Sequence, residues 1–383
     1  MTRALNLAAA AVVAIALATN LFRLWLLFTT LFPGDDFRFY FAMARVGLQY
    51  GWSRMYDLDL QCRPISEHIK ETTEHCPGLV LPPVAWLAAP FTELGYSAAY
   101  PVWVVFMALA CAALLAVCWD RLPRPKPLYL GAVLSVYPLA YCLFLGQVTV
   151  LATLGVALAW RLLARGHATW AGVGLVLILA KPHIVFLVPV ALLLTGRWRP
   201  VAVAGTITSM LGLLSLISIG PHGIETYLSD LKTYVGEPAN YVYTLAGWFG
   251  KNVYTTALQW ALGLVTLYTA WRFRAWLDAV ILVAIVGSAL SATYWHVQDY
   301  AVLILAVLAQ LSLGPRRPAV TWLAAFFIVG SPLLVGTTFV PPLVQISSWL
   351  VLLIAWLAWM ATRPAAYFGA SGRTQAPVPA AAT

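Results

Sequence analysis

Apolar segments long enough to cross a lipid bilayer recur along this whole chain, separated by short polar turns. A transmembrane helix needs about 20 apolar residues, because every backbone polar group inside hydrocarbon must be satisfied within the protein. Hydrophobic residues make up 62% of the 383-residue chain and charged residues only 10%. Soluble domains carry about 25% charge. We therefore predict an all-α polytopic membrane protein.

The basic residues indicate how this protein is oriented, because Lys and Arg in short loops stay on the cytoplasmic side. If the clusters of Lys and Arg are placed on the cytoplasmic side, the sequence predicts a multi-pass protein of a bacterial-type plasma membrane, with both termini cytoplasmic. The net charge of +9 then reflects contact with anionic lipid, and we expect no nucleic-acid partner. About twelve spans result, at roughly 4–32, 98–119, 128–145, 148–164, 168–181, 184–196, 201–219, 253–271, 276–292, 300–313, 319–335 and 343–361.

Residues 1–362 are expected to form a single transmembrane domain, followed by a disordered cytoplasmic tail at 363–383. Two external loops, 33–97 and 220–252, exceed ordinary connector length, which is typical of functional loops. Inside the first, the apolar stretch 78–96 contains three prolines, so we expect it to re-enter or lie at the interface. Several spans are short, which predicts a chamber in the outer half of the membrane.

The first loop opens with "FPGDDFRFYF", where Pro33 and Gly34 end the first helix and Asp35 is placed to cap the next. We predict an amphipathic helix lying on the outer leaflet. Its apolar face would hold Phe37, Tyr40, Phe41, Ala44 and Leu48, and its polar face Arg38, Arg45 and Gln49. One cap needs one carboxylate, so Asp36 is the functional candidate and Asp35 the second choice.

Further polar side chains fall at outer turns of the predicted topology. They are Gln147 in "LGQVTVL", Lys181 and His183 in "LAKPHIV", and Tyr294, His296 and Asp299 in "TYWHVQDY". Aromatic belts explain Tyr and Trp at such turns, and lysines can snorkel to the interface, but neither explains the histidines and Asp299. All the clusters lie on one side of the membrane, which predicts one extracytoplasmic active site.

Cysteines and acidic pairs in the first loop suggest a disulfide and no metal site. Cys62 and Cys76 would close a loop of about 15 residues on an oxidising exterior. Their spacing with the nearby histidines does not fit a zinc site. Asp57 and Asp59 form a D-x-D pair, which can hold a divalent ion against a diphosphate. No soluble nucleotide-binding domain accompanies it, so we expect loop capping and no cofactor.

These motifs resemble those of glycosyltransferase family 87, whose members are GT-C membrane enzymes that use polyprenyl-phosphate-mannose. The resemblance spans roughly residues 30–310 and rests on the order and spacing of short motifs. They are Gly34-x-Asp36-Phe37, Tyr40, Tyr56-Asp57, "LGQVTVL", the helix ending in Lys181-Pro182, and "YWHVQDYAVLILAVL". Two features differ from the family pattern: the second aspartate, and Leu81-Pro82-Pro83 where an aromatic residue usually precedes the prolines.

The resemblance implies an inverting transfer of a sugar from a polyprenyl-phosphate donor to a lipid or glycan acceptor at the extracytoplasmic face. Mannose is the expected sugar and arabinofuranose the alternative; an ion-coupled transporter is the alternative in another class. We expect Asp36 to act as general base, with His296 also catalytic. Lys181 and His183 would bind the donor phosphate. Gln147, Tyr40, Tyr294 and Asp299 are expected to bind the sugar or acceptor.

Overall fold

The computed structural model describes residues 3–30, 34–66, 78–122, 125–234, 237, 240–313 and 353–362. All regular elements in these ranges are helices. The predicted span 319–335, most of 343–361 and the tail 363–383 lie outside them. The all-α prediction is confirmed for the part of the chain that is described.

In the described ranges the helices labelled α1 to α15 carry the fold, and several of the turns between them are 3₁₀. The helices are α1 (Arg3–Thr30), α2 (Asp35–Tyr50), α3 (Leu58–Ser66), α4 (Pro82–Ala88), α5 (Tyr96–Val117), α6 (Lys126–Leu134), α7 (Tyr137–Leu145), α8 (Thr149–Ala164), α9 (Ala168–Leu175), α10 (Leu187–Leu194), α11 (Trp198–Tyr234), α12 (Leu245–Phe249), α13 (Val253–Arg272), α14 (Leu277–Ser291) and α15 (Leu303–Ser312). A further apolar helix, Leu353–Thr362, follows.

Three of these helices, α1, α5 and α11, are long and apolar enough to cross a membrane. A fourth span results if α6 and α7, which are bent by 52° at their junction, count as one. Other apolar helices, such as α8 and α14, are shorter than a normal span. These helices indicate a membrane protein, and the total of twelve spans stays a prediction.

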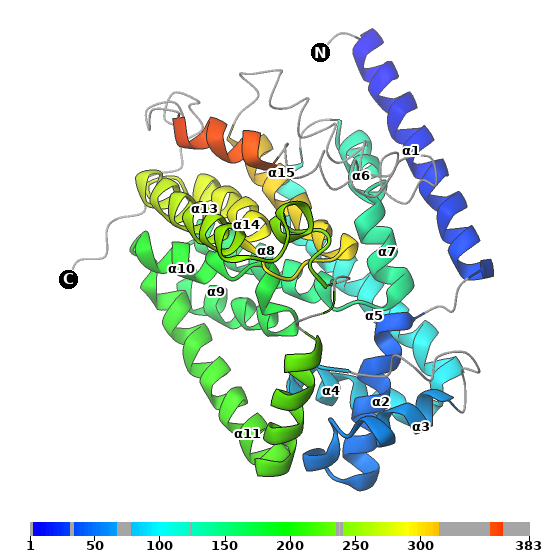
Figure 1. Ribbon diagram of the computed structural model, residues 1–383. Coiled ribbons are helices and arrows are strands. Elements are labelled where there is room, and N and C mark those ends of the chain that lie inside the picture. The colour runs from blue at the N-terminus through cyan, green and yellow to red at the C-terminus, as the bar shows by residue number, and fades with distance from the viewer. Residues whose placement is uncertain are drawn as a thin grey trace.

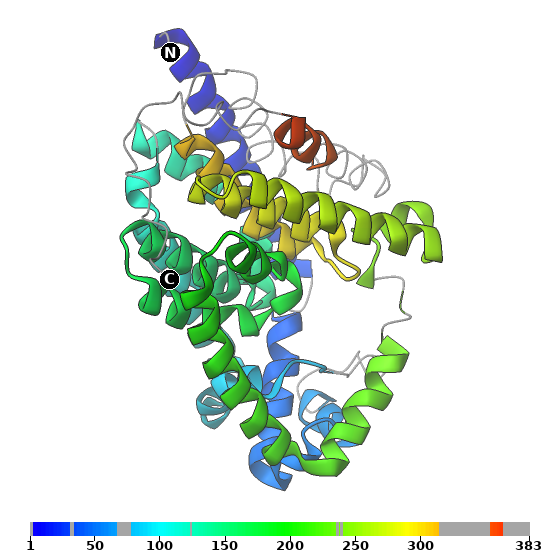
Figure 2. The same cartoon turned by 90° about the vertical axis from the view of Figure 1, so that its left-hand side faces the viewer.

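Two predicted segments differ from the helices in the structure, one in its middle and one at its end. The segment 128–145 is broken, because Val136 is extended and Pro138 cannot donate the N–H that would continue α6. The segment 201–219 continues as α11 to Tyr234, across a kink at Gly220 (φ 59, ψ −173) that precedes Pro221. The first part of the predicted loop 220–252 is therefore helical, and α11 forms a V in both views (Figures 1 and 2).

The first loop forms a helical lobe at the lower end of both views, beside the V of α11 (Figures 1 and 2). The helix α2 forms where predicted and buries Phe37, Tyr40, Phe41 and Ala44 of its predicted apolar face, but the predicted placement of Arg38 and Leu48 is wrong. Arg38 is only 5% exposed and Leu48 is 51% exposed. The cause is tertiary, since α2 packs against α3, α4, α5 and α7. It is thus mostly enclosed by protein.

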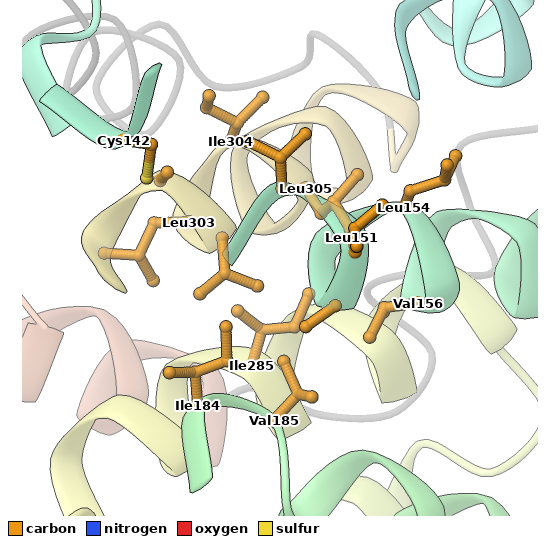
Figure 3. Packing of buried hydrophobic residues seen from close by; sticks show 14 of the residues in the cluster. Cys142, Leu151, Leu154, Val156, Ile184, Val185, Ile285, Leu303, Ile304 and Leu305 are labelled. Atoms are coloured by element: carbon orange, nitrogen blue, oxygen red, sulfur yellow. The ribbon is translucent and has the colours of Figure 1, made fainter. Parts of the chain in front are cut away.

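The apolar core lies around α8 and α14. Every residue of α14 from 277 to 290 is buried, so this helix is surrounded by protein. Figure 3 shows this packing, with side chains from α8, α14, α15 and the turn before α10 meeting one another. Among them are Leu151, Val156, Ile184, Ile285 and Leu305. The amino-terminal ends of α8 and of the segment leading into α15 carry the polar residues described next.

Candidate functional site

The start of α2 is held against the end of α7, more than a hundred residues along the chain. Gly34 donates its N–H to the carbonyl oxygen of Phe144 at 3.0 Å, and the Tyr100 hydroxyl donates to the same oxygen at 2.7 Å. The Tyr96 hydroxyl donates to the Gly34 carbonyl at 3.0 Å. Gly34 has φ 82, and a Cβ there would lie 2.5 Å from the Tyr100 ring. This glycine therefore lets α2 begin beside Gln147.

Asp36 is the half-buried acceptor at the centre of the site. Gln147 donates Nε2–H to its Oδ2 at 2.8 Å, and Gln298 donates Nε2–H to the same oxygen at 3.4 Å. The Gln147 oxygen itself accepts from the Tyr40 hydroxyl at 2.8 Å and from the Val148 N–H at 3.0 Å. The amide of Gln147 must therefore turn its NH₂ toward Asp36. No other described residue hydrogen-bonds to Asp36, so Oδ1 is left for a ligand.

The surroundings of Asp36 tune it toward proton transfer. Burial raises the pKa of its carboxyl to about 6, an increase that the nearby Lys181 ammonium opposes and Asp35 reinforces. A carboxylate with this pKa is ionised at neutral pH and is a stronger base than an ordinary aspartate. Asp36 is therefore suited to accept a proton from a substrate hydroxyl.

Asp35 has a different environment. Its side chain is 51% exposed and pairs with Arg38 at 2.7 Å. Neither aspartate caps α2, because the helix begins at Asp35 and Gly34 occupies the cap position with no side-chain hydrogen bond. The predicted capping role of Asp35 is therefore wrong.

A buried ion pair lies close to Asp36. Lys181 Nζ is 2.6 Å from Asp299 Oδ1, and the two residues are 7% and 0% exposed. Lys181 leaves helical geometry (φ −156, ψ 74) because it precedes Pro182, and this break turns its side chain inward. Thr149 donates its hydroxyl to Asp299 Oδ1 at 3.1 Å. The Lys181 ammonium makes no further hydrogen bond within the described chain.

Two histidines and a tyrosine line the more accessible side of this pair. The Tyr294 ring stacks on His296, with centroids 4.9 Å apart, and meets His183 edge-on at 4.7 Å. Burial lowers the pKa of His296 to about 4, although Asp299 opposes the shift. Burial also lowers the pKa of His183. Both rings are thus neutral at pH 7.

The structure brings all the predicted substrate-contacting residues into one cluster, drawn from four separate segments. They are Asp36, Tyr40, Gln147, Lys181, His183, Tyr294, His296 and Asp299. Asp299 differs from the expectation of a sugar contact, because its carboxylate is fully buried. Its Oδ2 accepts from the backbone N–H of His296 at 3.0 Å and lies 3.7 Å from His183 Nε2. Asp299 therefore acts on the site as a counter-ion.

Three further residues join the cluster without having been predicted to: Thr149, Asn240 and Gln298. Gln298 lies in the turn "TYWHVQDY" already marked as polar, so its position was a usable signal. Asn240 comes from the segment predicted to be the second external loop, and its Oδ1 lies 3.3 Å from His296 Nε2. Nothing in the local sequence distinguishes it from a turn asparagine.

The remaining predicted residues of the first loop lie apart from this cluster. Cys62 is disulfide-bonded, and Cys76 lies outside the described residues. Asp57 of the D-x-D pair contacts Arg54 at 2.9 Å and His222 at 2.8 Å, so it links the first loop to α11. Asp59 lies in the first turn of α3. Among the residues described, no group of three or more His, Cys, Asp or Glu side chains could hold a metal ion.

The site combines a half-buried acid, amides, a lysine and histidines at the ends of apolar helices. This arrangement is typical of integral membrane enzymes. The family model of glycosyltransferase family 87 matches residues 82–313, more than half of the chain. The chain belongs to this family, and it is a membrane glycosyltransferase.

The matched range includes the polar segments around Gln147, Lys181 and His296, whereas Asp36 and Tyr40 precede it. Searches of curated proteins and of solved structures each found no match. The family match gives the ion-coupled transporter alternative no support.

Proposed function

We propose that this protein is an inverting glycosyltransferase that moves a sugar, mannose in the first instance, from a polyprenyl-phosphate donor to a lipid or glycan acceptor. The observation that carries the proposal is the contact between Asp36 and the turn that holds Gln147, next to the buried Lys181–Asp299 pair. A base and a cation thus lie within one cluster. Transfer from a phosphate-linked donor needs both.

In the proposed step, Asp36 Oδ1 takes the proton of the acceptor hydroxyl as the acceptor oxygen attacks the anomeric carbon. The bond between that carbon and the phosphate oxygen breaks, and its electron pair leaves with the polyprenyl phosphate. Attack from the side opposite the phosphate inverts the configuration. Asp36 is the base rather than Asp35, because the Asp35 side chain is 51% exposed and already paired with Arg38.

The leaving phosphate gains negative charge, and fixed donors nearby stabilise it in the transition state. Lys181 supplies the charge, since its ammonium has only one partner in the described chain and retains two N–H groups. His183 is 33% exposed in its side chain and can add a neutral N–H donor. Tyr294 presents an aromatic ring beside it, a surface on which a sugar face can pack.

The site is proposed to face the extracytoplasmic side, with both termini cytoplasmic. The disulfide at Cys62 supports this orientation, because disulfides persist in oxidising compartments and Cys62 lies in the first loop. No metal ion is proposed to take part. The acidic pair that would be the candidate ligand set is engaged otherwise, with Asp57 bound to Arg54 and His222.

The test is sugar transfer by purified protein in lipid nanodiscs, supplied with a lipid extract as acceptor. Polyprenyl-phosphate-mannose, polyprenyl-phosphate-arabinofuranose and a nucleotide sugar are offered separately, each with and without a chelator. We expect transfer from a polyprenyl-phosphate sugar alone, undiminished by the chelator. Transfer only from the nucleotide sugar would reject the donor class, and preference for arabinofuranose would reject mannose.

A further inference from the structure

Asn240 fastens the second external loop to the turn that carries His296. It is 5% exposed, its backbone carbonyl accepts from the Trp295 N–H at 3.1 Å, and its Nδ2–H donates to the Tyr234 carbonyl at 2.7 Å. The same loop is tied a second time, because the Tyr300 hydroxyl donates to the carbonyl of residue 243 at 3.0 Å. This segment therefore packs against the catalytic cluster and holds Asn240 in place.

The amide of Asn240 has a defined orientation. Because its NH₂ is used on a carbonyl of α11, its Oδ1 must be the atom that lies 3.3 Å from His296 Nε2. A carbonyl oxygen only accepts, so His296 must carry its proton on Nε2. Nδ1 is then an acceptor, and Gln298 Nε2 lies 3.4 Å from it.

Gln298 passes this constraint on to Asp36. Its NH₂ has two hydrogens, one directed at His296 Nδ1 and the other at Asp36 Oδ2. The distance from Gln298 Nε2 is 3.4 Å in both cases. If His296 carried its proton on Nδ1, that N–H would oppose the Gln298 amide, and the contact with Asp36 would be lost. The tautomer of one ring thus decides how many donors Asp36 Oδ2 receives.

We propose that Asn240 is a positioning residue: it holds His296 in the tautomer protonated on Nε2, so that Gln298 donates to Asp36 Oδ2 and Oδ1 is the oxygen that takes the substrate proton. This inference rests on the proposed function for its catalytic consequence. It also assigns His296 a supporting role, because its Nε2–H is used by Asn240 and its Nδ1 by Gln298.

The contact is tested without any substrate by nuclear magnetic resonance of the full chain labelled with ¹⁵N-histidine in nanodiscs. His296 is one of six histidines, and its signals are those lost in His296→Ala. Spectra at about pH 8 keep the ring neutral. In the wild type we expect the proton resonance of a hydrogen-bonded Nε2–H. This resonance should move upfield in Asn240→Leu and return to its wild-type position in Asn240→Asp. A signal unchanged in Asn240→Leu, or a proton found on Nδ1 in the wild type, would overturn the proposal.

The two Asn240 variants also separate positioning from simple fastening of the loop. Asn240→Asp keeps an oxygen for His296 but loses the donor to Tyr234, whereas Asn240→Leu loses both. We expect kcat to fall about tenfold in Asn240→Leu, with the donor KM little changed, and to recover largely in Asn240→Asp. Equal losses in the two variants would mean that only the fastening matters.

A double-mutant cycle with His296→Ala completes the test. If Asn240 acts through His296, then Asn240→Leu adds no further loss of kcat once the ring is gone. Additive losses would overturn the proposal. If the wild-type protein transfers no sugar at all, the proposed function fails, and the resonance comparison still decides whether Asn240 sets the tautomer.

Discussion

Replacing Asp36 with asparagine should abolish sugar transfer and at the same time stabilise the protein. Asparagine has the same shape, and its oxygen can still accept from Gln147 and Gln298, which now donate to Oδ2 at 2.8 and 3.4 Å. It cannot accept the proton of an acceptor hydroxyl. Loss of a general base lowers the rate by about 10²–10⁴-fold, and we expect kcat to fall within this range.

The stabilisation follows from the raised pKa of Asp36, which is about 6 in the folded protein against 3.8 for an unperturbed aspartate. A higher pKa in the folded state means that folding favours the protonated carboxyl. The ionised Asp36 carboxyl therefore opposes folding above the folded-state pKa, and this effect disappears below about pH 4, where the carboxyl is protonated in both states. The shift corresponds to about 3 kcal/mol, which partial solvent exposure of Asp36 reduces to about 1–3 kcal/mol. Asp36→Asn removes this cost.

The assay pairs transfer rates with thermal unfolding of the detergent-solubilised protein at acidic and at mildly basic pH. The variant should unfold at a higher temperature than the wild type at basic pH, and the difference should vanish at acidic pH. Asp35→Asn is the matched control, because Asp35 is 51% exposed and pairs with Arg38, so its loss should leave kcat nearly unchanged. Full transfer activity in Asp36→Asn would refute the assignment of the base.

Three further predictions follow from the same contacts. Transfer by the wild type should rise with pH and reach half its maximum near the pKa of Asp36, about 6, since only the carboxylate accepts a proton; a flat profile from pH 5 to 8 would contradict this. Lys181→Met should raise the donor KM and destabilise the protein by about 3–5 kcal/mol, because it leaves Asp299 charged and buried. Adding Asp299→Asn to this variant should recover part of the lost unfolding temperature. Cys62→Ser should cost about 3 kcal/mol of stability if the partner is Cys76, as the sequence predicts, because that disulfide would close a loop of about 15 residues. Unfolding of the wild type with and without reductant should show the same loss.

The helical fold and the membrane class could be predicted from the sequence, because both depend on local properties. Apolar length, proline positions and scarcity of charge act within one segment, and they do not need a partner elsewhere. The break at Lys181-Pro182 is of the same kind, since proline restricts the residue before it. The sequence also predicts that Gln147, Lys181 and His296 lie in one cluster, because each is at a helix end on the same predicted side of the membrane.

The tertiary structure decided what each of these residues does. The choice between Asp35 and Asp36 depends on the direction in which α2 starts, and a hydrogen bond from Gly34 to Phe144 sets that direction from a distant part of the chain. The sequence predicts that Lys181 binds the donor phosphate, and only the structure shows that Asp299 is its partner. Asn240 comes from a loop with no distinguishing motif, and only the structure shows its contact with His296. Sequence patterns report which groups reach the same side of a membrane. Which atoms meet there depends on helix rotation and packing, which involve contacts between residues a hundred or more positions apart.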